Sequence, residues 1–180
     1  AYQQTGQSVG TPGTDPATQL VIGQAKAALT KSACPMGMRT GVISADASAA
    51  LVNGLGANRF EAKEQIKQQY LTGNMGVFNG FNFTESNQVA RHTVGTSNGN
   101  YVTTAAGTEG GTSIGVETGT GTYTKGDVIT VEGVYKENPR TKVSTGDLMQ
   151  LTVTEAYTGG TGTISYSPAL YSSGPLQNVN

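Results

Sequence analysis

A strict alternation of apolar and polar residues late in the chain most narrows the folds open to it. The alternating positions are Met149, Gln150, Leu151, Thr152, Val153 and Thr154. This is the pattern of a strand with one buried face. Together with its neighbours it predicts three strands, at residues 126–135, 147–156 and 162–166. The 26 glycines and the absence of Trp also favour turn-rich β-structure over a helical bundle.

The first part of the chain predicts a mixture of helices and a short strand. Asp15 is placed to cap a helix that has Pro16 in its first turn and runs to about Ser32. Its expected apolar stripe consists of Ala17, Leu20, Val21, Ala25, Ala28 and Leu29. A short strand is expected at Val42 and Ile43.

Two further helices are expected before residue 75. Ser44 is placed to cap a helix at 47–52, and Gly54 is expected beyond its end. Asn58 and Glu61 have capping-box spacing at the start of a polar helix that closes near residue 73.

From residue 75 onward the apolar residues no longer recur at helical spacing but at the spacing of extended chain. Residues 75–83 predict an extended run interrupted by glycine, and residues 87–94 predict a second strand or an extended arm. Gly, Thr, Ser and Asn dominate 96–122, so its "GTEGGTSIG" and "GTGTYTKG" stretches predict loops. We therefore expect three parts: a lead-in at 1–15, an α+β segment at 16–95 and a β-rich domain at 96–180.

Charge, hydropathy and cysteine count exclude several classes of protein. Charged residues make up 13% of the chain and the net charge is −1, so no basic field is present to attract nucleic acid. No apolar run reaches the ~18 residues of a membrane-spanning helix. Cys34 is the only cysteine, which rules out an internal disulfide and a thiolate metal cluster, and we expect it to be a small buried hydrophobe.

No residue pattern points to catalysis, to a cofactor or to a metal. His92 is the sole histidine and has no partner at a catalytic spacing, while Asp46, Asp127, Asp147 and Glu155 are scattered at turns and strand ends. The tyrosines leave two interpretations open. They could form a face on which sugars or bases stack, or their rings could pack in the core with the hydroxyls near solvent. Those considered are Tyr101, Tyr123, Tyr135, Tyr157, Tyr166 and Tyr171.

The two ends of the sequence suggest a processed product or a piece of a longer protein. The first residues are polar and do not form a signal peptide, and the first residue is not Met.

Several stretches resemble the coat proteins of short-tailed phages of the Salmonella-phage type. "KGDVITVEGVY" and "NPRTKVSTGDLMQLTV" look like the start of the insertion domain in that family. "RTGVISADASAALVN" is similar to the family segment in which a strand leads into a short helix. The stretch "NRFEAKEQIKQQYLTGNMGVFNGFNFTESNQVARHTVG" resembles the part that runs up to the insertion.

The resemblance implies a fold and a role. It implies part of the tailed-phage major capsid fold over 16–95, near the axial and peripheral domains, followed by a small, mainly antiparallel β-barrel insertion domain over 96–180. Members of the family are over twice this length, so the chain would be an internal segment. The implied function is structural: self-assembly, as hexamers and pentamers, into an icosahedral shell around the genome.

The implied location is the virion, with assembly in the host cytoplasm and with scaffolding and portal proteins as further partners. Within the connection "KENPRTKVSTGD", charges of both signs are expected to make polar contacts with a neighbouring subunit, the alternative being a solvated loop. The residues are Lys136, Glu137, Arg140, Lys142 and Asp147.

Two other functions remain open from the residues alone. One is a secreted β-rich adhesin or carbohydrate-binding module that uses its tyrosines. The other is a hydrolase assembled from the scattered acids. The missing signal peptide and Trp count against the first, and the missing nucleophile–base spacing counts against the second.

Overall fold

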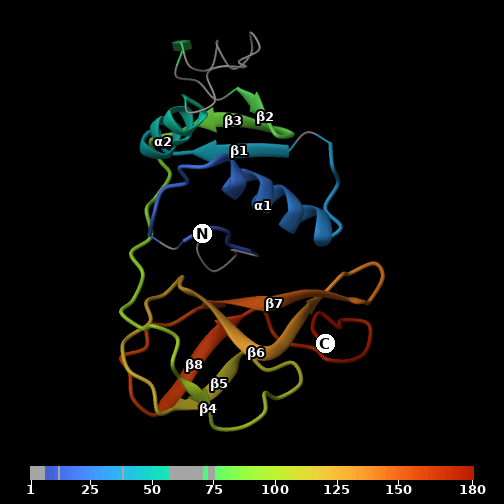
Figure 1. The fold of residues 1–180 in the computed structure, drawn as a ribbon. Helices are drawn as coiled ribbons and strands as arrows, with labels where there is room; N and C mark the ends of the chain where they lie inside the picture. Colours follow the sequence, from blue (N-terminus) through green and yellow to red (C-terminus); the bar gives the residue numbers. More distant parts are fainter. Residues whose placement is uncertain (1–6, 12, 38, 57–70, 73–75) are drawn as a thin grey trace. The chain divides into compact units, whose positions relative to one another are not determined.

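The computed structural model shows a mixed α+β protein that is mostly sheet (Figure 1). It describes residues 7–11, 13–37, 39–56, 71–72 and 76–180. The chain divides into two compact units. We call residues 9–91 the α+β unit, and residues 7–8 together with 92–180 the β unit.

The α+β unit is built on a three-stranded sheet in the order β1-β3-β2. Strand β1 (Arg39–Ile43) runs parallel to β3 (Phe81–Glu85), and β2 (Val77–Phe78) is antiparallel to β3. Two helices, α1 (Gln19–Lys31) and α2 (Ala45–Gly56), accompany the sheet. Since parallel strands need a crossover connection, α2 lies in the chain between β1 and β3.

One face of this sheet carries the core of the unit. Phe81 of β3 packs with Ile22 of α1 and Leu51 of α2 in one buried cluster. Val42 and Asn82 alternate with the inward residues and are exposed. The helices therefore bury one face of the sheet and leave the other to solvent.

The strand at Val42 and Ile43 and the cap at Ser44 are confirmed. The backbone amide of Ala47 donates a hydrogen bond to Ser44 Oγ at 3.2 Å. The helix, however, runs from Ala45 to Gly56, so Gly54 lies inside it and not beyond its end. A Cβ at Gly54 would overlap the backbone oxygen of Ala17, so a residue without a side chain is needed for this close approach.

The predicted start of α1 is wrong. The helix begins at Gln19 with Thr18 as N-cap, and no side chain caps it. Asp15 instead forms an ion pair with Arg91, 2.9 Å between Nη2 and Oδ2. The apolar stripe is right only in part: Leu29 packs against the core cluster, but Leu20 is 68% exposed, and the buried residue is Ile22, which the predicted stripe left out.

Helix α1 ends in a Schellman motif that lacks the usual glycine. The Cys34 amide donates to the Leu29 carbonyl at 3.0 Å, and the Ala33 amide donates to that of Thr30. Ala33 takes the left-handed conformation, with φ of 57°. An L-residue there costs about 1 kcal/mol relative to glycine.

The extended run at 75–83 is a β-hairpin where it is described. Asn79 and Gly80 join β2 to β3, with φ of 49° and 84°, which fits the two-residue turn that Asn-Gly favours. Residues 87–94 form no strand: residues 87–88 lie in a turn, and 89–94 have no regular secondary structure. The predicted helix from Asn58 and Glu61 lies almost wholly outside the described residues.

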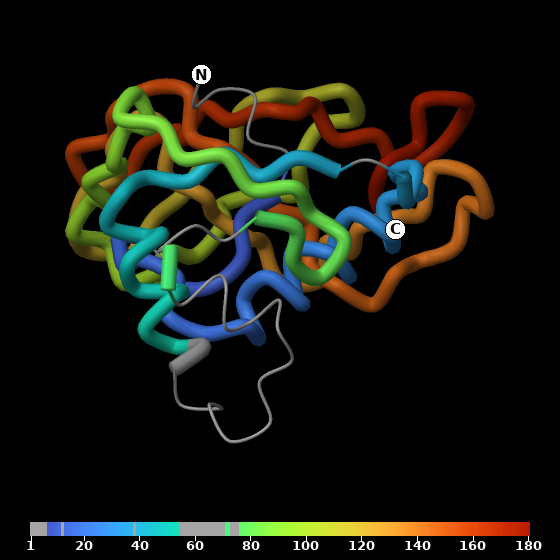
Figure 2. Tube along the Cα trace, turned by 90° about the horizontal axis from the view of Figure 1, so that it is seen from above, coloured from blue at the N-terminus to red at the C-terminus, as the bar shows by residue number. Residues whose placement is uncertain are grey.

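The β unit is a curled, half-barrel antiparallel sheet in the order β4-β5-β8-β7-β6. Its strands are β4 (Val102–Thr103), β5 (Ser113–Glu117), β6 (Val128–Glu137), β7 (Ser144–Val153) and β8 (Gly162–Ser167). The three predicted strands correspond to β6, β7 and β8. Figure 2 follows the same chain from above.

The core of this sheet lies under its central strands. Leu151 and Val153 are fully buried, as the alternation predicted, and Tyr166 is 1% exposed. Thr152, which the alternation assigns to the solvent face, is buried as well, at 1% exposed. The loop predicted over 96–122 is wrong for Ser113–Glu117. That segment is β5, which pairs with both β4 and β8, because Ile114 and Val116 supply two buried side chains among the glycines.

The outer edge of β6 is covered by residues 178–180. Tyr135 and Asn180 exchange two backbone hydrogen bonds of 3.0 and 2.9 Å, and the Glu137 amide donates to the Asn178 carbonyl. Val179 enters the core cluster. This short segment therefore acts as a further strand and protects the edge.

Candidate functional site

The expected contact loop connects β6 to β7 and is tightly folded. The Asn138 side-chain oxygen accepts hydrogen bonds from the amides of Arg140 at 2.9 Å and Thr141 at 3.3 Å. The Asn138 amide donates to the Val143 carbonyl, and the Lys142 amide donates to the Asn138 carbonyl. These bonds fix the loop over six residues, 138–143.

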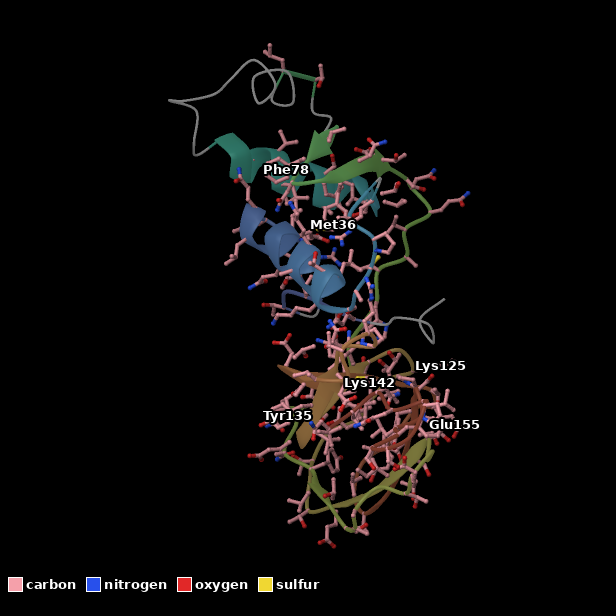
Figure 3. The ribbon with its side chains drawn as sticks, turned by 90° about the vertical axis from the view of Figure 1, so that its right-hand side faces the viewer. Met36, Phe78, Lys125, Tyr135, Lys142 and Glu155 are labelled. Carbon is pink, nitrogen blue, oxygen red and sulfur yellow. The ribbon has the colours of Figure 1, made fainter. Side chains whose placement is uncertain are left out.

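Lys142 ties this loop to the last segment of the chain. Its Nζ donates to the Gln177 carbonyl at 2.8 Å and lies 3.5 Å from that of Pro175. The loop and this segment lie side by side at one end of the sheet (Figures 1 and 2). Lys142 is thus engaged within the unit, although its side chain is at the surface (Figure 3).

Glu137 does not belong to an exposed loop, which corrects that part of the expectation. It is the last residue of β6 and only 3% exposed. Its Oε1 accepts a 2.6 Å hydrogen bond from Gln177 Nε2, while Oε2 has no partner among the described residues. The strand continues this far because residues 178–180 pair with its edge.

Lys136 and Asp147 lie on the paired strands and not in the loop. Burial lowers the pKa of Lys136, and the negative charge of Asp147 partly offsets this effect. The hairpin is irregular here, since the register shifts on either side of Tyr135. The five expected residues are therefore split, with only Arg140 and Lys142 in the loop.

The exposed end of the hairpin is basic and apolar, not of mixed charge. Arg140 is exposed, as are Val143 in the same loop (62%) and Leu176 in the segment that Lys142 contacts (67%). We call Arg140, Lys142, Val143 and Leu176 the hairpin-end surface. The sequence predicted the two cations of this surface but not Leu176. Leu176 belongs to it only because Lys142 contacts the neighbouring residues 175 and 177.

A second constellation, missed by sequence reasoning, joins His92 to Asp127. His92 Nε2 lies 2.6 Å from Asp127 Oδ1. The carboxylate, whose side chain is 2% exposed, also accepts hydrogen bonds from the amides of Gly95 and Thr124. Burial alone would raise the pKa of Asp127, but the hydrogen bonds from His92, Thr124 and Gly95 outweigh it and lower the pKa.

The only sequence signal for this pair was local. Acids at turns are commonly solvated or bond a local amide, and the bond of Asp127 to the Thr124 amide is of the second kind. The Thr124 hydroxyl lies 2.9 Å from Asp127 Oδ1 and 3.0 Å from the Thr93 carbonyl. In a catalytic triad the hydroxyl contacts the imidazole, whereas here it contacts the carboxylate. The geometry is that of a clasp between residues 92–95 and the turn before β6.

Arg39 is a buried cation that sequence reasoning did not single out. It is 8% exposed, and its guanidinium donates to the carbonyls of Cys34 and Pro35 at 3.0 Å each. At 3.3 Å it also reaches the Lys26 carbonyl and the Thr30 hydroxyl. It therefore joins the end of α1 to the start of β1. Cys34, expected to be buried, is only half-buried.

The tyrosines favour the core interpretation. Tyr101, Tyr123 and Tyr157 lie with ring centroids 5.6 to 6.5 Å apart and pack against the core cluster. The hydroxyls of Tyr101 and Tyr157 donate 2.6 Å hydrogen bonds to the carbonyls of Gly121 and Gly160. Aromatic rings packed on glycine-rich backbone account for part of the unusual composition.

Within the described residues, no three His, Cys, Asp or Glu side chains gather into a possible metal site. None of the described helices is long and apolar enough to cross a bilayer. No protein-family model matches the sequence, and a comparison with curated proteins gave no match.

Proposed function

We propose that the chain is a structural subunit, a phage major capsid protein or a segment of one, that acts by packing against copies of itself. Its place is then the virion, and its partners are other subunits of an icosahedral shell, with scaffolding and portal proteins during assembly. The proposal assigns it no catalysis.

The observation that carries the proposal is the hairpin-end surface. It is the end of the hairpin whose sequence resembles the phage insertion domain, and its loop is held by hydrogen bonds before any partner arrives. A pre-ordered loop loses little conformational entropy on contact, which favours association. Arginine is enriched in protein interfaces, and the two exposed aliphatic side chains of this surface would bury apolar area against a partner.

The α+β unit supplies a second kind of support. Leu20, Met36 and Leu71 are each more than two-thirds exposed, and Val42 and Val77 stand on the uncovered face of the sheet. A unit with so many large apolar side chains at its surface is suited to burial against other chains. Many weak, identical contacts hold a closed assembly together.

Charge reversal in the protein expressed from its complete gene tests the role of the loop. Arg140→Glu should slow shell assembly or lower shell stability, because it places a carboxylate where the partner accommodates a cation. Lys125→Glu is the matched control, since Lys125 is also exposed but lies outside the hairpin-end surface. Shells that form equally fast and melt equally high in both variants contradict the contact role of Arg140.

A further inference from the structure

The loop that carries Leu176 is fixed within the β unit. The Tyr171 amide donates to Asn178 Oδ1 at 2.9 Å, and the Asn178 amide donates to the Tyr171 carbonyl at 3.0 Å, which closes the loop. The carboxylate of Glu109 accepts hydrogen bonds from the amides of residues 172 and 173 at 3.0 to 3.2 Å. Leu176 is therefore held at the surface by its own loop, as the other members of the hairpin-end surface are held by theirs.

The positive charge of the hairpin-end surface is not neutralised within the described part of the chain. Lys142 is engaged with backbone carbonyls, and the Arg140 side chain has no hydrogen bond or ion pair with any described residue. The loop over residues 138–143 contains no acid. Because an unpaired buried charge is costly, a partner that covers this surface must supply a carboxylate as well as apolar area.

Four acids of the β unit are exposed, and two of them are already engaged. Glu109 is bonded to residues 172 and 173, and Glu155 accepts a hydrogen bond from the Ser165 hydroxyl at 3.5 Å. Glu117 and Glu132 have no hydrogen bond or ion pair among the described residues. These two carboxylates are the ones that a cation from another chain can pair with.

Glu117 combines its charge with an exposed aliphatic neighbour. Val102 of β4 is its partner in the antiparallel register with β5 and is 55% exposed. Partners in such a register share one face of the sheet, and the buried Val116 faces the other way. Glu132 lies in the irregular stretch of β6 and has no partner in the register with β7.

The same two residues stand at an open edge. Strand β4 is the last strand of its sheet, and no described strand pairs with its outer side, whereas the outer edge of β6 is covered by residues 178–180. We call Val102 and Glu117 the edge surface. It is acidic and aliphatic where the hairpin-end surface is basic and aliphatic.

We propose that the hairpin-end surface of one copy of the chain docks on the edge surface of a second copy. Arg140 then faces Glu117, and the aliphatic side chains of the two surfaces bury each other. The inference rests on the proposed function, because it names the partner of the surface that carries it. A contact between two different surfaces of one chain is heterologous, so it repeats from copy to copy until the assembly closes.

Charge exchange in the protein expressed from its complete gene tests this pairing, with assembly followed by light scattering and closed shells counted by electron microscopy. Arg140→Glu and Glu117→Arg should each slow assembly about tenfold, because each sets like charges against each other. The two changes together should restore the parent rate to within about threefold. Glu132→Arg is the matched control, and combined with Arg140→Glu it should leave assembly as slow as Arg140→Glu alone.

A mixture of the two single variants shows whether the charges meet between copies. Arg140→Glu is acidic at both positions and Glu117→Arg is basic at both, so each variant supplies the charge that the other lacks. The mixture should assemble faster than either variant alone. Recovery in the double variant without recovery in the mixture places the pair within one chain and overturns the contact between copies.

The outcomes separate this inference from the proposed function. Slow assembly of Arg140→Glu that Glu117→Arg does not restore overturns the edge surface as the partner and leaves the proposed function standing. Equal recovery with Glu132→Arg also overturns it, since the effect is then one of net charge. Parent-like assembly of Arg140→Glu contradicts the contact role of Arg140, and the inference fails with it.

Charge removal replaces charge reversal if a reversed variant melts at a lower temperature than the parent. Arg140→Gln and Glu117→Gln should each slow assembly, and the double variant should be no slower than the slower single variant, because both changes remove the same pair. Losses that multiply in the double variant overturn the pairing.

Discussion

Replacing Arg39 by Met gives the sharpest test of how the α+β unit is held together. The guanidinium has two hydrogen bonds of 3.0 Å to carbonyls of the loop after α1 and two longer ones to α1 itself. Hydrogen bonds from a charged group contribute about 1.5 kcal/mol or more each when the partner is left unpaired. Replacing the buried cation recovers part of the lost free energy, because the cost of desolvating the guanidinium also disappears.

The net expectation for Arg39→Met is a loss of about 2–3 kcal/mol in the free energy of unfolding of the α+β unit. Arg39→Lys should lose about half as much, because an ammonium keeps the charge but not the planar fork. Arg140→Met makes the same chemical change at an exposed arginine and should cost at most about 0.5 kcal/mol.

Urea unfolding followed by hydrogen exchange separates the two units. With a slope of about 1 kcal/mol/M, Arg39→Met should move the midpoint of α1 protection down by about 2–3 M and leave those of β7 and β8 in place. Equal midpoints for Arg39→Met and Arg140→Met refute the reasoning, since burial and the four acceptors would then contribute nothing.

Three further predictions concern stability. Leu151→Ala removes a fully buried side chain from the β-unit core and should cost about 2–5 kcal/mol by chemical denaturation; a loss under about 1 kcal/mol contradicts the core assignment. Ala33→Gly should stabilise α1 by about 1 kcal/mol in the same assay, and any destabilisation contradicts the left-handed assignment. Folding lowers the pKa of Asp127 from 3.8, so the stabilisation that this carboxylate provides is present above about pH 4 and is lost as the pH falls through the lower folded pKa. Asp127→Asn should therefore reduce the dependence of the free energy of unfolding of the β unit on pH in the acid range. Parallel pH dependences of the parent and Asp127→Asn contradict this prediction.

The strands that carry buried aliphatic residues could be predicted from the sequence. Met149, Leu151 and Val153 alternate, and the structure buries all three. Strand β5 was missed because its two buried residues, Ile114 and Val116, stand among Gly, Thr and Ser, whose local preference is for turns. Pairing with β4 and β8 decides its conformation, and such pairing leaves no local signal.

The errors in the α+β unit have the same origin. Asp15 satisfies the local rule for a helix cap, but its ion pair with Arg91 lies 76 residues away in the chain. Leu20 and Ile22 both fit a helical stripe, and only the position of Phe81 shows which one faces the core. Gly54 has the sequence appearance of a helix stop, yet the approach of Ala17 is what requires it.

For the candidate site, the two loop cations could be predicted from the sequence, but the residues around them could not. Arg140 and Lys142 could be found because charged residues beside a Pro mark a loop. The burial of Glu137 could not, since it depends on Gln177 and on the pairing of residues 178–180 with β6. The clasp between His92 and Asp127 depends likewise on a tertiary contact, across 35 positions.

Electron microscopy of the protein expressed from its complete gene, combined with light scattering, tests the central claim most directly. The account predicts closed shells of uniform size, and it predicts that Arg140→Glu reduces their number or stability while Lys125→Glu does not. A protein that stays monomeric at high concentration, with both variants indistinguishable from the parent, contradicts it.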